Sequence, residues 1–339
     1  MTRHDIRHLV CHSLTVGVVA ACAGVVVAAQ QAPPAQPDPA ALARQAELNK
    51  RPDTPGTGRF PAIKEEVASL PRHVVYRPKE LGALGNTKLG VVAWGNGGCS
   101  DDGASSRFHL LEIASHGYLV IASGQILSGP GAPPREPRAA APAAPQGQLP
   151  PPRTQVSDLT DAVDWALAEN TRTGSPYFGR IDPALIAYSG WSCGGVQALQ
   201  VAKDPRVKTL VIHNSGILNN GPTNMTGTSV GKELLQSLHT PVIYIEGGPT
   251  DIAYENGMDD FKRITHVPAA MANLPVGHGG TFNELNGGAA ASVAVSWLNW
   301  QLRGDTQSAK RFVSEDCGLC QDAQWSLQRK QFPDARGSR

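Results

Sequence analysis

A serine set between glycines is the feature of this sequence with the clearest chemical potential. Residues 190–194 read GWSCG and match the G-x-S-x-G pattern, in which a tight turn between a strand and a helix exposes the serine hydroxyl. Residues 227–231 read GTSVG and match the same pattern around Ser229. Glycine makes up 36 of the 339 residues, so the pattern alone does not decide between the two serines.

The flanking residues favour Ser192 over Ser229. Ser192 follows the apolar run ALIAY at 184–188 and precedes GGVQAL at 194–199, which has the composition of a helix start. This is the strand, turn and helix context that the motif requires. Ser229 instead follows NNGPTNMT at 219–226, which is polar and turn-forming. We therefore expect Ser192 to be the nucleophile.

A base and an acid for this serine are present downstream. A serine hydroxyl is a weak nucleophile at neutral pH and needs a base, which in turn needs an acid to orient it. Asp251 lies just past the apolar run PVIYIEG at 241–247, and His278 lies in the glycine-rich segment LPVGHGG at 274–280. Ligands of α/β sheets bind beyond the carboxyl ends of the strands. The sequence therefore predicts Asp251 as the orienting acid and His278 as the base.

Each of these partners has alternatives. Asp251 could instead cap the helix that follows it, and the acids that would then replace it are Glu246, Glu255 and Asp259. His278 could instead be a turn residue. The other candidates for the base, His239 and His266, precede or enter apolar strands and are less well placed. His213 ends the run VKTLVIH at 207–213 but precedes Asp251 in the chain, so we expect it to line a pocket or fill the core.

Two segments could supply backbone donors for the negatively charged oxygen of a tetrahedral intermediate. One donor is expected to be the N–H of Cys193, the residue after the serine. The other is expected in WGNGGC at 94–99, which follows a strand and whose glycines allow the backbone to approach a substrate closely. We predict Asn96 or Gly97 as this second donor. The alternative is that the segment is an ordinary tight turn.

The elements that must position these residues alternate along the chain. Short apolar runs rich in β-branched residues predict strands at 73–76, 89–94, 118–122, 184–188, 207–213 and 241–247. Apolar residues recur at helical spacing from Phe108 to Ala114, before Gly117, and from Leu159 to Leu167. Apolar strands that alternate with helices indicate a mostly parallel sheet covered on both faces, so the predicted fold class is α/β.

The composition suits one large globular domain with unstructured additions, or two small domains. Hydrophobic residues make up 41% of the chain and charged residues 17%. The formal net charge is +1 and Lys and Arg form no block, so nucleic acid is not expected as a partner. No pattern in the sequence indicates a metal or another cofactor.

Two segments rich in Pro and Ala cannot build a core. Residues 30–58 are expected to form a disordered linker. Residues 127–153 are expected to be a loop insertion within the domain, because periodic apolar segments lie on both sides. The predicted domain covers 59–320 and is followed by a tail at 321–339. The Asn, Gly and Thr content of 214–236 suggests a mobile loop near the pocket, and whether it forms a lid is open.

The first 29 residues have the pattern of an export signal. Arg3 and Arg7 precede an apolar run from Ser13 to Ala29, which ends in small residues suited to signal peptidase. A permanent membrane anchor is one alternative, since about 17 apolar residues lie at the lower limit for spanning a bilayer. A lipoprotein modified at Cys22 is another. We expect a periplasmic or secreted protein with no stable membrane insertion after cleavage.

With these residues in place, the chain resembles the α/β-hydrolase superfamily. Within it, the chain is similar to the exported esterase branch of dienelactone-hydrolase-like proteins, bacterial cutinase-like lipases and polyester hydrolases. The resemblance covers about residues 70–320. It rests on GWSCGG at 190–195, ASHGY at 114–118, the acid loop at Asp251, Gly277-His278 and the cysteines of the C-terminal region.

The resemblance implies an α/β-hydrolase fold and hydrolysis of carboxylic esters through an acyl-enzyme. Ser192 would be the nucleophile, His278 the base and then the acid, and Asp251 the group that orients His278. Cys193 stands where polyester hydrolases usually carry Met, and Asn96 stands where their oxyanion loop has an aromatic residue. A small soluble ester is therefore expected at least as much as a polymer. The alternatives are a peptidase or amidase, and an envelope-binding protein that kept the fold without turnover.

Four cysteines remain after removal of the signal segment. Four allow three pairings, and an exported protein can oxidise them. In the expected fold, the oxyanion loop and the serine turn are neighbours, so we hypothesise one disulfide between Cys99 and Cys193. A second is hypothesised between Cys317 and Cys320, where a zinc site with only two cysteine ligands would be a poor alternative.

Overall fold

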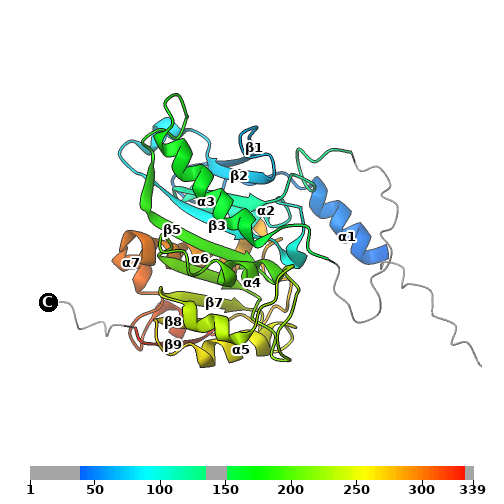
Figure 1. Ribbon diagram of the computed structural model, residues 1–339, viewed down its shortest axis with the longest axis vertical. Coiled ribbons are helices and arrows are strands. Elements are labelled where there is room, and N and C mark those ends of the chain that lie inside the picture. Colours follow the sequence, from blue (N-terminus) through cyan, green and yellow to red (C-terminus); the bar gives the residue numbers. More distant parts are fainter. Residues whose placement is uncertain (1–38, 135–150, 333–339) are drawn as a thin grey trace, which may run out of the picture. The chain divides into compact units, whose positions relative to one another are not determined.

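A twisted sheet organises residues 39–134 and 151–332, which are the residues that the computed structural model describes. Helices and strands alternate along this part of the chain (Figure 1). The elements are α1 (Pro39–Lys50), β1 (Ala62–Glu66), β2 (His73–Pro78), η1 (Leu81–Leu84), β3 (Leu89–Gly95), η2 (Gly97–Cys99), α2 (Arg107–Ser115), β4 (Tyr118–Ser123), α3 (Val156–Thr171), β5 (Ile181–Trp191), α4 (Cys193–Gln200), β6 (Thr209–His213), η3 (Lys232–Ser237), β7 (Val242–Glu246), α5 (Tyr254–Arg263), β8 (Ala269–Asn273), η4 (Leu285–Gly287), α6 (Gly288–Arg303), α7 (Thr306–Ala309), α8 (Gly318–Gln321) and β9 (Ser326–Lys330).

The strands lie in the order β1-β2-β4-β3-β5-β6-β7-β8-β9 within this described part. The pairings from β4 across to β8 are parallel. The two pairings at the β1 edge and the β8–β9 pairing are antiparallel. The predicted α/β class with a mostly parallel sheet is therefore confirmed.

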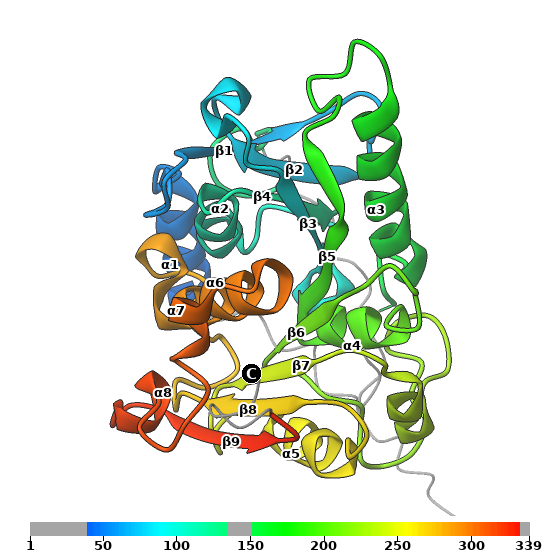
Figure 2. The same cartoon turned by 90° about the vertical axis from the view of Figure 1, so that its left-hand side faces the viewer.

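Helices cover both faces of the sheet, with α2 and α6 on one side and α3 and α4 on the other (Figure 2). Strand β3 shows how the sequence serves both layers. Val91 and Ala93 belong to the hydrophobic cluster under α3 and α4, whereas Val92 and Trp94 belong to the cluster under α2 and α6. A strand that is buried on both faces needs apolar residues at every position, which is why the central strands are continuous apolar runs.

Residues 39–58 differ from the predicted disordered linker. Residues 39–50 form helix α1, and the segment after it is anchored by Arg107, whose side chain is only 2% exposed. Arg107 donates hydrogen bonds to the carbonyl oxygens of Leu48 (2.7 Å) and Arg51 (3.1 Å) and pairs with Asp53 at 3.0 Å. Composition indicated no core here, but a buried cation in α2 supplies polar contacts that composition does not reveal.

The domain also extends beyond residue 320, the predicted boundary. Strand β9 adds to the sheet next to β8, and Trp325 before it is buried. The Lys330 ammonium donates hydrogen bonds to carbonyl oxygens at the C-terminal end of α5, including those of Lys262 (3.0 Å) and Ile264 (3.2 Å). The part of the predicted tail up to the end of β9 therefore belongs to the folded domain.

Four predicted segments fall wholly or partly outside the described residues. They are the export signal at 1–29, the first part of the linker at 30–38, the centre of the loop insertion at 135–150 and the end of the tail at 333–339. Among the helices that the structure does describe, none combines the length and the apolar character needed to cross a membrane.

Candidate functional site

The predicted site residues follow neighbouring parallel strands at one edge of the sheet. Ser192 follows β5, Asp251 follows β7 and His278 follows β8, and β6 lies between β5 and β7. Because these strands are parallel, their carboxyl ends meet at the same edge, where α/β proteins bind ligands. The loops at this edge bring the three side chains together.

Ser192 lies on a sharp turn between β5 and α4. Its φ of 54° and ψ of −121° fall in a region that residues other than glycine rarely adopt. A Cβ on Gly190 would overlap the backbone of Gly194, and a Cβ on Gly194 would overlap the backbone of Gly95. The two glycines of the motif are therefore required by close packing, and the Ser192 side chain remains partly exposed.

A chain of two hydrogen bonds links the three predicted residues. The Nε2 atom of His278 lies 3.0 Å from Oγ of Ser192, and its Nδ1 atom lies 2.6 Å from Oδ1 of Asp251. In a neutral imidazole whose Nδ1–H donates to the carboxylate, Nε2 is left to accept the serine proton. The Asp251 side chain is fully buried, whereas a quarter of the His278 side chain is exposed.

Asp251 is held by four donors. Oδ1 accepts hydrogen bonds from His278 and from the backbone N–H of Ala253 (2.8 Å), and Oδ2 accepts from Nδ2 of Asn214 (2.7 Å) and the N–H of Gly247 (3.1 Å). Burial raises the pKa of Asp251, but the hydrogen bonds from His278, Ala253 and Asn214 outweigh it and hold the pKa below its usual value. The N-cap of α5 is Ala253, without a side-chain hydrogen bond, so Asp251 precedes the helix and does not cap it.

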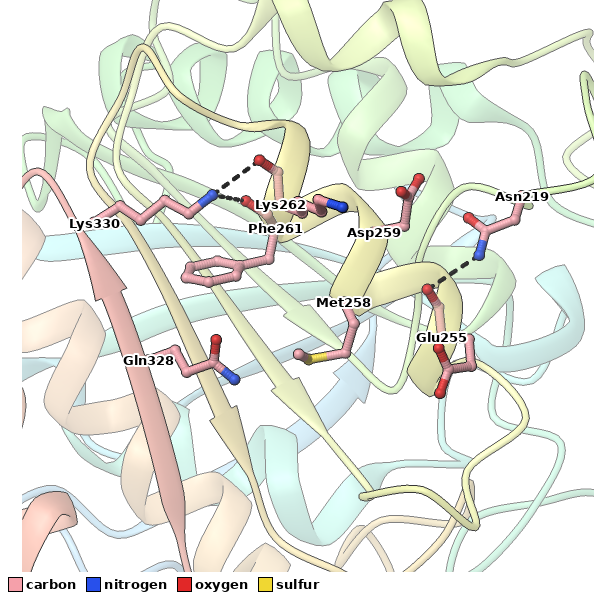
Figure 3. Close-up of a pocket in the computed structure, with 8 residues that line it drawn as sticks. All are labelled: Asn219, Glu255, Met258, Asp259, Phe261, Lys262, Gln328 and Lys330. Carbon is pink, nitrogen blue, oxygen red and sulfur yellow. Dashed lines mark hydrogen bonds between the residues drawn. The ribbon is translucent and has the colours of Figure 1, made fainter.

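The substitute acids are placed differently. Glu255 and Asp259 lie on α5, where they line a cavity of about 480 Å³ between α5 and β9 (Figure 3). Glu246 ends β7 and is 1% exposed. Burial and, to a lesser extent, the Asp251 charge raise the pKa of Glu246 well above its usual value, although a hydrogen bond from the N–H of Ser215 opposes them. Of the candidate acids, Asp251 is the one bonded to His278.

The rival histidines do not reach Ser192. His239 is exposed, and Nε2 of His266 lies 2.9 Å from the carbonyl oxygen of Leu238. His213 is fully buried and its ring packs against His109 at a centroid distance of 4.7 Å. Burial lowers the pKa of His213 well below its usual value, so its ring is neutral. Of the two predicted roles for His213, the core role holds.

The predicted oxyanion segments lie against each other. The backbone of Gly194 packs directly on that of Gly95 and Asn96, and the Cα atoms of Cys99 and Cys193 are 5.3 Å apart in a disulfide. Cys193 begins α4, where backbone N–H groups lack partners within the helix. The Asn96 side chain is buried and donates to the carbonyl oxygens of Ser100 (2.9 Å) and Ser123 (2.6 Å), which fixes the loop.

Both predicted cysteine pairings are present. Besides Cys99–Cys193, Cys317 and Cys320 form a disulfide with a Cα–Cα distance of 4.9 Å. Within the described residues, no group of three or more His, Cys, Asp or Glu side chains could hold a metal ion.

Ser229, the serine of the second G-x-S-x-G match, does not lie on a turn that joins a strand directly to an α-helix. Ser229 is exposed, in a segment where Thr223 and Val230 form an isolated antiparallel bridge. The surrounding loop, residues 214–236, is anchored to the core because Ile217, Val230 and Leu235 are buried.

Sequence reasoning missed two residues that contact the site. Trp191 donates a hydrogen bond from Nε1 to the carbonyl oxygen of His278 (2.9 Å), and its ring lies beside the imidazole at a centroid distance of 5.8 Å. Asn214 contacts Asp251 and directly follows β6. The signal that could have identified Asn214 is its position as a polar residue directly after an apolar strand.

Comparison with known proteins adds no family to this description: the chain matches no protein-family model and no curated protein sequence.

Proposed function

We propose that the protein is an exported serine esterase of the α/β-hydrolase fold. The observation that carries the proposal is the hydrogen-bonded chain Ser192–His278–Asp251, with Ser192 on a strained turn between a strand and a helix. The chain order Ser, Asp, His and the position of the serine at the carboxyl edge of the sheet are those of α/β-hydrolases. The two disulfides suit an oxidising compartment.

In the proposed reaction, Oγ of Ser192 attacks the carbonyl carbon of the ester while its proton passes to Nε2 of His278. Asp251 holds the Nδ1–H of His278 and stabilises the imidazolium that forms. The negative oxygen of the tetrahedral intermediate accepts hydrogen bonds from the N–H of Cys193 and from that of Asn96 or Gly97.

The intermediate then collapses as the bond between carbon and the alcohol oxygen breaks. His278 gives its proton to that oxygen, the alcohol leaves, and the acyl group remains on Ser192. A water molecule gives a proton to His278 and attacks the acyl carbon. The bond between the acyl carbon and Oγ of Ser192 then breaks, His278 returns its proton to Oγ, and the carboxylic acid is released.

The test is hydrolysis of p-nitrophenyl esters of increasing chain length, with a hydroxycinnamate ester and a polyester film for comparison. We expect turnover by the wild type, and its loss in Ser192→Ala but not in Ser229→Ala. The two serines share the same local pattern, so the second variant is a matched control. Equal turnover by wild type and Ser192→Ala would overturn the proposal.

A further inference from the structure

Asn214 adopts a conformation that few side chains tolerate. It follows the last residue of β6 with a φ of 43°, in the left-handed region, and it is 2% exposed. Its backbone N–H continues the sheet by donating to the carbonyl oxygen of Ile245 (2.9 Å). Asn is among the residues that enter this region most readily. The conformation turns the side chain towards the acid loop (residues 247–251).

The amide of Asn214 joins the acid loop to the histidine loop (residues 274–280). Its Nδ2 atom donates to Oδ2 of Asp251 (2.7 Å) and to the carbonyl oxygen of Gly277 (3.1 Å), the residue before His278. Both partners are acceptors, so the amide nitrogen and not its oxygen must face them. The N–H of Gly277 donates to the carbonyl oxygen of Gly247 (2.8 Å), which forms a second link between the same loops.

Glycines on both loops leave room for this amide and for no larger group. A Cβ on Gly247 would lie 2.8 Å from Nδ2 of Asn214, and a Cβ on Gly280 would lie 3.0 Å from its Oδ1. Both distances are shorter than ordinary van der Waals contact. The Asn214 amide is therefore held from two sides.

We propose that Asn214 is a positioning residue for the reaction, one that fixes the plane of the Asp251 carboxylate and the spacing between the acid and histidine loops. This inference rests on the proposed function. Without the amide, the carboxylate keeps the backbone N–H groups of Gly247 at Oδ2 and Ala253 at Oδ1, but its plane is less firmly fixed against Nδ1 of His278. The base then loses its orientation, whereas no substrate-binding group is removed.

The experiment compares Asn214→Gly, Asn214→Asp and Asn219→Gly with the wild type. Glycine accepts the positive φ and removes only the amide, whereas aspartate keeps the shape but presents oxygen to two acceptors. Asn219 lies in the same loop and donates to the carbonyl oxygen of Glu255 (3.1 Å), so Asn219→Gly is the control. Hydrolysis of p-nitrophenyl acetate is measured, and active sites are counted with a fluorophosphonate.

We expect kcat per titrated site to fall about 100-fold in Asn214→Gly, because misplacing a catalytic group by about 1 Å can have an effect of this size. KM should stay within about two-fold, since binding is untouched. Asn214→Asp should lose at least as much, and Asn219→Gly should match the wild type.

Wild-type kcat per titrated site in Asn214→Gly and Asn214→Asp would overturn the inference, even if both variants were less stable. If Asn214→Gly does not fold, the isosteric Asp variant decides alone. Failure of the proposed function would look different, because the wild type itself would then show no labelling that depends on Ser192. The positioning role would fall with it.

Discussion

At the scale of single residues, backbone strain at Ser192 is a central feature of the candidate site. A residue other than glycine in the conformation of Ser192 costs about 1–3 kcal/mol, and such strain persists only where the surroundings impose it. Here the N–H of Ser192 donates to the carbonyl oxygen of His213 (3.0 Å), and its own carbonyl accepts from Oγ of Ser215 (2.6 Å). These contacts fix the turn and aim Oγ at His278.

Replacing Asp251 by Asn should leave the fold intact and remove most of the activity. An amide would donate to Nδ1 of His278 and stabilise the tautomer whose Nε2 carries a proton and cannot accept one from Ser192. We expect kcat for p-nitrophenyl acetate to fall about 10⁴-fold, with an unchanged circular dichroism spectrum. The control is Glu255→Gln, which alters a candidate acid on α5 and should keep wild-type kcat. Loss of activity in the control with retention in Asp251→Asn would assign the acid to Glu255.

The three candidate catalytic residues could be predicted from residue type and position, whereas the hydrogen bonds of the residue that holds two of their loops together could not. Ser192 and Asp251 each follow an apolar run, His278 lies in a glycine-rich segment, and their types are those of a nucleophile, an acid and a base. Asn214 carries no acid–base chemistry, and its bonds exist only because two distant loops converge on it. Such contacts depend on the loop paths, which no local pattern encodes.

At the scale of elements, the Cys99–Cys193 disulfide joins η2 to the start of α4. These two elements carry the proposed oxyanion donors, and the cysteines are 94 residues apart in sequence. A disulfide that closes a long loop restricts the unfolded chain more than one that closes a short loop. The Cys317–Cys320 disulfide spans only three residues.

Removing each disulfide by paired alanine substitution should therefore have unequal effects. In Cys99→Ala/Cys193→Ala, we expect the free energy of unfolding to fall by about 2–5 kcal/mol. We also expect kcat to fall, by no more than the roughly 100- to 1000-fold that loss of one oxyanion donor costs. Cys317→Ala/Cys320→Ala should keep wild-type kcat. Urea unfolding and ester hydrolysis measure both quantities, and equal kcat in the two double variants would refute the proposed link to the oxyanion donors.

Docking of the segment after α1 depends on Asp53, which lies between two buried cations. Arg107 is 2% exposed and Lys64 is 4% exposed, and both pair with this carboxylate. Asp53→Ala leaves two buried charges without their partner, so we expect a loss of about 3–5 kcal/mol in the free energy of unfolding. Glu47→Ala, which breaks an exposed pair with Lys50, should change it by less than about 0.5 kcal/mol. Similar urea midpoints for the two variants would contradict this account.

Three strands that the sequence does not predict lack the continuous apolar runs of the central strands, for two different reasons. Strand β1, AIKEE, and strand β9, SLQRK, lie at the two edges of the described sheet, where one side of the strand has no neighbour and charged residues are tolerated. Strand β8, AAMAN, is buried but built mainly of alanine, which has low β-propensity. The central strands were predictable because burial on both faces demands continuous apolar runs.

At the scale of the whole molecule, two neutral histidines are buried in the core near Ser192. The rings of His109 and His213 pack with Trp94 and Phe282, and their nitrogens have no hydrogen-bond partner among the described residues. Burial lowers the pKa of His109 to about 3. Because the folded protein keeps this ring neutral, acid favours the unfolded chain, where it can take up a proton.

Replacing His109 by Phe should make stability less sensitive to acid. An unfolded histidine has a pKa near 6.5. Below this pH the wild type therefore loses stability relative to the variant, down to a pH of about 3. Between pH 6.5 and 4.5 the difference in unfolding free energy should shift by about 2.3 kcal/mol in favour of the variant. Titratable groups common to both proteins cancel in this comparison. Parallel stability profiles in urea unfolding at several pH values would show that His109 takes up a proton as readily in the folded state as in the unfolded chain.

The account rests on Ser192 being a nucleophile that His278 and Asp251 activate. The most direct test is incubation of the folded full-length protein with a fluorophosphonate, followed by intact-mass and peptide mass spectrometry. The account predicts one covalent adduct per chain, located on Ser192, that is absent in Ser192→Ala and retained in Ser229→Ala. No adduct on the folded wild type, or an adduct that persists in Ser192→Ala, would contradict it.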